Sequence, residues 1–150
     1  MPSYVAVVGP GTDATEAQCA LAEDVGARLA EAGAIVVTGG LGGVMEAACR
    51  GARSRRGTTV GLLPGLDRGA ANGWVDVAIP TGLGELRNGL VVRAADALVA
   101  VGGGAGTLSE IALAVKGGLV VAGLGTWELP GVTAAASAQD AVALALQPAR

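Results

Sequence analysis

The sequence predicts an α/β fold: a doubly wound, Rossmann-like sheet, mainly parallel, with helices on both faces, over residues 1–150 as a single domain. Three observations predict it. Short aliphatic runs alternate with alanine-rich segments, and the connections between them are short. The chain contains 26 glycines, which suit tight turns and close packing. Hydrophobic residues make up 51% of it and aromatic residues only 2%, so the core must be aliphatic, as in a sheet buried on both faces.

Each predicted strand is a short aliphatic run, and each predicted helix repeats apolar residues at helical spacing. In chain order, the strands cover residues 4–9, 34–38, 58–63, 74–79, 97–101 and 119–124. The helices cover the segment that ends at residue 33, residues 44–52 and 86–93, the segment that ends at residue 116, and residues 138–146. Asp13 and Glu16 can form a capping box at the start of the first helix, and Gly33 ends it. Residues 64–72 form a loop.

A glycine-rich turn after residues 97–101 is suited to binding an anion. Gly103, Gly104 and Gly106 allow the backbone to approach a phosphate closely, and the helix start offers unpaired N–H groups and the positive end of its dipole. Thr107 adds a hydroxyl group. Glu110 follows in the same helix, where a carboxylate is out of place unless it faces another part of the ligand. It is therefore a candidate for chemistry, and its alternative role is to stabilise the helix start electrostatically.

A second glycine-rich turn follows the strand at residues 34–38. It contains Gly39, Gly40 and Gly43 and leads directly into the next helix. Ligands of doubly wound sheets bind beyond the carboxyl ends of the strands, where the connections diverge to the two faces. We therefore expect both turns to lie on that edge and to hold a phosphate together.

Composition excludes several classes of function. The formal net charge is −3 and the isoelectric point is about 4.8, so no basic field favours nucleic acid as a partner. The chain has no histidine, which excludes Ser-His-Asp and Cys-His catalysis and histidine-bound metals. Cys19 and Cys49 are dispersed, so we predict no disulfide, no metal site and no required cofactor. Without a leader or a long apolar run, we expect a cytoplasmic protein with no membrane partner.

Two common nucleotide-binding motifs are missing. The first strand leads into Gly9-Pro10-Gly11 rather than Gly-x-Gly-x-x-Gly, and the second strand ends in Thr38-Gly39 where a ribose-binding acid would be needed. This disfavours NAD and FAD. The only lysine is Lys116, so a Walker A loop is excluded.

The two glycine-rich turns resemble the LOG-like, so-called "lysine decarboxylase" family of the Rossmann-like group that also includes DprA-type proteins. The family signature Pro-Gly-Gly-x-Gly-Thr-x-x-Glu is matched by Gly103, Gly104, Gly106, Thr107 and Glu110, with Gly102 in place of the proline. The upstream motif Gly-Gly-x-x-Gly-x-Met is matched by Gly39, Gly40, Gly43 and Met45. In the phosphoribohydrolases of this family a functional arginine lies fifteen positions before the proline, and that position is Arg87.

The resemblance implies roles for these residues. The glycines and Thr107 would hold a phosphate, and Arg87 would anchor it or stabilise developing charge. Glu110, ionised near the helix start, would stabilise an oxocarbenium-like ribose or orient water during hydrolysis of a nucleoside 5′-monophosphate. Protonation of the leaving group has no evident donor, and Glu46 and Glu85 are the other acids near the motifs.

Departures from the hydrolase pattern favour a binding protein. The hydrolases have Met-His-Glu-Arg-Lys where this chain has Gly-Glu-Leu-Arg-Asn at residues 84–88. In this respect the chain resembles more closely a branch of small proteins that includes molybdenum-cofactor carriers. The resemblance therefore implies a carrier-like protein that binds a phosphorylated pterin, a molybdopterin-type ligand, or a nucleotide. The phosphoribohydrolase is the alternative, and a ligand-sensing oligomer is a third reading. A homodimer or homotetramer is expected from the family and the apolar helices.

Overall fold

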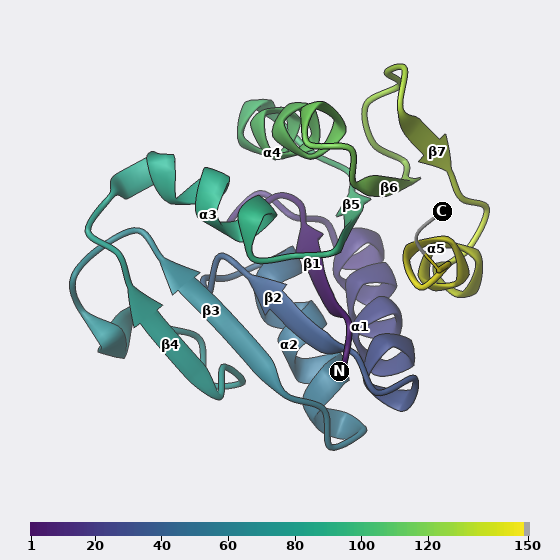
Figure 1. Cartoon of the computed structure of the whole chain (residues 1–150). Helices are drawn as coiled ribbons and strands as arrows, with labels where there is room; N and C mark the ends of the chain where they lie inside the picture. The colour runs from purple at the N-terminus through teal and green to yellow at the C-terminus, as the bar shows by residue number, and fades with distance from the viewer. Residues whose placement is uncertain (149–150) are drawn as a thin grey trace.

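The computed structural model describes residues 1–148. Within them a seven-stranded sheet has the order β4-β3-β2-β1-β5-β6-β7, and neighbouring strands are parallel (Figure 1). The strands are β1 (Tyr4–Val8), β2 (Ile35–Thr38), β3 (Thr59–Leu63), β4 (Val77–Pro80), β5 (Ala97–Val101), β6 (Val120–Leu124) and β7 (Val132–Ala134). The predicted doubly wound α/β fold is confirmed.

Helices cover both faces of the sheet. They are α1 (Glu16–Glu31), α2 (Val44–Ser54), α3 (Arg87–Arg93), α4 (Ala105–Lys116) and α5 (Ala138–Ala145). Helices α1, α2 and α5 pack on one face, and α3 and α4 pack on the other. No helix among the described residues is both long enough and apolar enough to cross a membrane.

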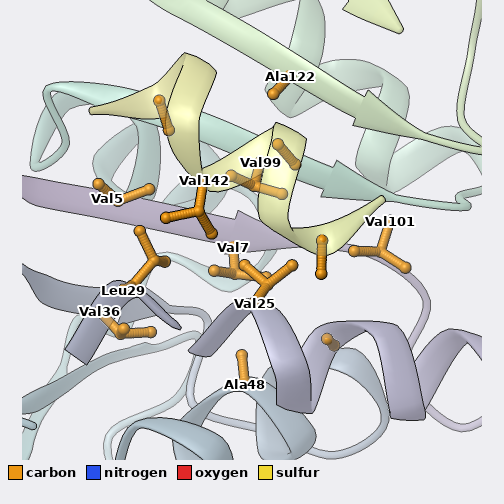
Figure 2. Packing of buried hydrophobic residues seen from close by; sticks show 14 of the residues in the cluster. Val5, Val7, Val25, Leu29, Val36, Ala48, Val99, Val101, Ala122 and Val142 are labelled. Atoms are coloured by element: carbon orange, nitrogen blue, oxygen red, sulfur yellow. The ribbon is translucent and has the colours of Figure 1, made fainter. Parts of the chain in front are cut away.

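The core on the α1 side is aliphatic. Val7 and Val99 lie on the neighbouring strands β1 and β5 and meet Val25 of α1 and Val142 of α5 (Figure 2). Such side chains fill the layer between sheet and helices without aromatic rings, as the composition predicts.

Helices α1 and α2 are in contact through their backbones. A Cβ atom added to Gly26 would lie 2.0 Å from the carbonyl oxygen of Ala48, and one added to Gly51 would lie 1.9 Å from that of Glu23. Only glycine allows this approach. The contact fixes α2, and with it the turn between β2 and α2, beside the turn that follows β1.

The sheet differs from the prediction in its edge strands. Strand β4 begins at Val77 rather than at residue 74, because the side chain of Asn72 accepts a hydrogen bond from the Trp74 amide at 2.9 Å and keeps this segment in a turn. Strand β7 was not predicted, since its three residues make too short a run for a periodic signal. The described chain therefore has seven strands rather than six.

The predicted cap of the first helix is wrong. Thr15, not Asp13, caps α1: its hydroxyl oxygen accepts from the Gln18 amide at 3.1 Å, and the Gln18 side chain accepts from the Thr15 amide at 2.9 Å. The Ala14 amide donates to the Gly11 carbonyl at 3.0 Å, which closes a turn before the helix starts. Asp13 is thereby left on the turn and is one of the residues that line the cavity described next.

Candidate functional site

The candidate site lies where the chain leaves the sheet in two directions. After β1 it runs to α1 on one face, and after the neighbouring strand β5 it runs to α4 on the other (Figure 1). Ligands of doubly wound sheets bind at such a switch point. A cavity of about 300 Å³ opens there. It is lined by residues 7–11, 13, 39, 45, 87, 88, 104–107 and 110.

The turn from β5 to α4 leaves backbone donors available to a ligand. Gly104 is the N-cap residue and offers no side-chain cap, so the N–H groups of the first helical residues, 105–107, remain to be bound. A Cβ atom on Gly103 would lie 2.6 Å from Thr107, which shows how tightly the turn is folded. The indole nitrogen of Trp127 donates to the Gly104 carbonyl at 3.2 Å and steadies the turn from outside. These free donors at the positive end of α4 suit an anionic group.

Arg87 brings a buried positive charge to the same cavity. It begins α3, is 9% exposed, and donates from Nη2 to the Gly39 carbonyl at 3.4 Å and from Nη1 to the side chain of Asn88. Its Nε is buried and has no hydrogen-bond partner among residues 1–148. Burial lowers the pKa of the Arg87 guanidinium and the negative charge of Glu110 opposes this, yet arginine stays charged. An unsatisfied donor on a buried cation is a further feature suited to an anion.

Glu110 lies on the wall formed by α4 and is 8% exposed. Burial raises its pKa to about 7, although the charge of Arg87 acts to lower it. The expectation that this carboxyl stays fully ionised is therefore wrong, because the loss of hydration outweighs the nearby positive charge. This carboxyl therefore changes its protonation near neutral pH. Glu46 and Glu85 do not line the cavity.

The structure brings together six of the predicted site residues. Those that line the cavity are Gly39, Arg87, Gly104, Gly106, Thr107 and Glu110. Gly40, Gly43 and Gly103 do not line it. A Cβ atom on Gly40 would lie 2.7 Å from the Leu63 side chain, and one on Gly43 would lie 2.1 Å from the Gly11 carbonyl oxygen. The conformation and close packing of these glycines shape the wall of the site instead of forming its surface.

Sequence reasoning missed the turn after β1. Gly9, Pro10, Gly11 and Asp13 line the cavity. In the sequence, Gly9 to Gly11 served as evidence against a dinucleotide motif, and Asp13 was interpreted as a helix cap. The available signal was the place of this turn directly after a buried strand, since that position shares the ligand edge with the other turns. Asn88, next to Arg87, was also missed as a lining residue.

The cavity combines features suited to an anion with a carboxylate and some apolar surface. Met45 supplies the apolar part, whereas the side chains of the lining residues Val7 and Val8 are buried in the core. Among residues 1–148, no three Cys, Asp or Glu side chains gather where they could hold a metal ion. The prediction that the protein requires no metal stays a prediction.

Comparisons with known proteins extend over almost the whole chain. The family described as "SLOG cluster4 family" matches residues 2–150. A protein of Archaeoglobus fulgidus, described as uncharacterized, is 44% identical over 120 residues, which are 80% of this chain and 78% of that protein. The molybdenum cofactor binding protein from the phototrophic bacterium Rippkaea orientalis has a TM-score of 0.91 at 36% identity, covering 96% of this chain and 95% of the other. The molybdenum cofactor carrier protein of Chlamydomonas reinhardtii has a TM-score of 0.88 at 38% identity, covering 95% of each chain.

Proposed function

The chain belongs to the SLOG cluster4 family, and from that premise we propose that it binds a phosphorylated pterin of the molybdopterin type in the cavity between β1 and β5. Its similarity to molybdenum cofactor carrier proteins supports a ligand-binding role. The observation that carries the proposal is the convergence of the glycine-capped start of α4 with the buried, partly unsatisfied Arg87 on one cavity. In the proposed complex the ligand phosphate accepts hydrogen bonds from the N–H groups of residues 105–107.

Arg87 is the group that gives the phosphate contact its strength. Hydrogen bonds between a cation and an anion are roughly twice as strong as neutral ones, and this cation is already desolvated before the ligand arrives. Because Gly39 and Asn88 hold two of its nitrogens, the guanidinium loses little freedom on binding. The site is thus organised to hold the phosphate of a ligand firmly.

Purification from a host that makes molybdenum cofactor tests the proposal. We expect the wild type to retain pterin and molybdenum, measured by fluorescence of the oxidised pterin and by elemental analysis. Arg87→Ala should lower both at least tenfold, because it removes a charge-assisted contact of about 1.5–3 kcal/mol. Arg56→Ala is the matched control: Arg56 is exposed and outside the cavity, so its loss removes the same charge but should leave the content unchanged. A wild type without pterin, or an Arg87→Ala variant with undiminished pterin, would contradict the proposal.

A second candidate function is favoured by the pKa of Glu110. Cleavage of the N-glycosidic bond of a nucleoside 5′-monophosphate needs a proton donor, and a carboxyl with a pKa of about 7 can donate near neutral pH. If this reaction occurs, purified protein will release free base from AMP, and Glu110→Gln will lower the rate about a hundredfold, about 2.7 kcal/mol of barrier. Chromatography of the base measures it. A wild type that binds AMP but releases no base above the uncatalysed rate would leave only the carrier function.

A further inference from the structure

Glu110 is a buried carboxyl that the folded chain does not satisfy. It is 8% exposed and lines the cavity, and the hydrogen bonds among the described residues include none to its oxygens. Nor does it form an ion pair with Arg87, although both line the same cavity. Within residues 1–148, the fully buried side-chain atoms without a partner are Arg87 Nε and Thr126 Oγ1, so the oxygens of Glu110 remain accessible from the cavity. Its acceptors are therefore available to a group that enters the cavity.

Glu110 lies further along α4 than the N–H groups at the helix start, on the same cavity. At a rise of 1.5 Å per residue, the Cα atom of Glu110 lies about 9 Å along the helix axis from that of Gly104, and its side chain leans back toward the helix start. It follows Thr107 by three residues, so the two side chains share one face of α4, and both line the cavity. A ligand in the cavity can therefore contact both the N–H groups at the helix start and an unpaired carboxylate. Met45, which also lines the cavity, offers apolar surface to a flat ring.

We propose that Glu110 determines ligand specificity by accepting paired hydrogen bonds from a 2-amino-4-oxopyrimidine edge, the edge that pterins and guanine share. On this edge a ring N–H and an exocyclic amino group point the same way, at the spacing of the two oxygens of a carboxylate. A ring without the amino group offers one donor and leaves the second oxygen unsatisfied. This inference rests on the proposed phosphoester site and identifies a second chemical feature of its ligand.

The pair GMP and IMP isolates the proposed contact, since these nucleotides differ only in the 2-amino group. Calorimetry at pH 8, above the pKa of about 7 of Glu110, measures both affinities with the full-length chain. The wild type should bind GMP at least about tenfold more tightly than IMP, as expected for one charge-assisted hydrogen bond. Glu110→Gln should reduce that ratio to about twofold or less, because the amide has one acceptor oxygen instead of two.

Glu31→Gln is the matched control. Glu31 ends α1 and its exposed side chain pairs with Arg55, away from the cavity, so the wild-type ratio should persist. The inference is overturned if the wild type binds GMP and IMP equally, or binds neither. It is also overturned if Glu110→Gln strengthens both equally, since Glu110 would then only repel anions.

The outcome separates this inference from the proposed function. Retained pterin without a preference for GMP over IMP leaves the carrier function standing and removes the specificity assigned to Glu110. A preference that depends on Glu110, in a protein that carries no pterin, supports the specificity and indicates a guanine nucleotide as the ligand.

Discussion

Gly43→Ala is expected to lower the free energy of unfolding by about 3–5 kcal/mol. Gly43 has φ +65° and ψ −129°, a backbone conformation that alanine adopts only under strain. Its Cβ atom would also lie 2.1 Å from the carbonyl oxygen of Gly11 and 2.5 Å from that of Pro10. Both obstacles are backbone atoms, so no side chain can rotate to make room. The substitution therefore forces apart the turn after β1 and the turn after β2.

Urea denaturation of the two neighbouring glycine variants measures the effect. A Cβ atom on Gly42 would have no neighbouring atom within 4 Å, and Gly42 does not lie in the left-handed region. Gly42→Ala should therefore change the free energy of unfolding by about 0.5 kcal/mol or less. Equal stabilities of the two variants would show that the two turns are not packed as described.

Glu110→Gln is expected to raise the free energy of unfolding of the ligand-free chain, relative to the wild type, as the pH increases. The difference between variant and wild type should be about 3 kcal/mol larger at pH 8 than at pH 4.5. The pKa of this carboxyl rises from its ordinary 4.5 to about 7 in the folded chain. Between those values the folded chain retains a proton that the unfolded chain has lost, so wild-type stability falls as the pH rises through this window. Below it both states are protonated and the penalty is absent. Above this window the folded wild type bears the full cost of a buried, ionised carboxylate. Glutamine has no charge, so the variant does not have this cost.

Denaturation at several pH values measures the free energy of unfolding of the variant and of the wild type. In the difference between the two, the contributions of the other titrating groups cancel. Glu31→Gln is again the control, and its difference from the wild type should stay nearly constant because exposed ion pairs contribute little. Parallel stability curves for the wild type and Glu110→Gln would contradict the burial of an ionised carboxyl. A positive result would mean that the chain retains a destabilising group at its candidate site, as binding sites often do.

Local sequence patterns were sufficient to predict most of the fold and the family. The aliphatic runs and glycine-rich turns predicted the doubly wound sheet and both turns, and the spacing from Gly39 to Met45 and from Gly103 to Glu110 predicted the family resemblance. Both predictions are confirmed. They succeeded because strand period, helix period and turn conformation depend on neighbours along the chain. Local patterns could not predict the three-residue strand β7, because it is ordered by pairing with β6.

The sequence by itself thus determined that this chain forms a parallel sheet with two glycine-rich turns at one edge, and which residues those turns contain. Only the tertiary structure decided what surrounds them. It brought Asp13 into the cavity, set Arg87 against the carbonyl of Gly39, and buried Glu110 deeply enough to raise its pKa. The reason is physical: burial and desolvation are fixed by every element packed around a group. The contacts of this site join residues tens of positions apart, which no local pattern specifies.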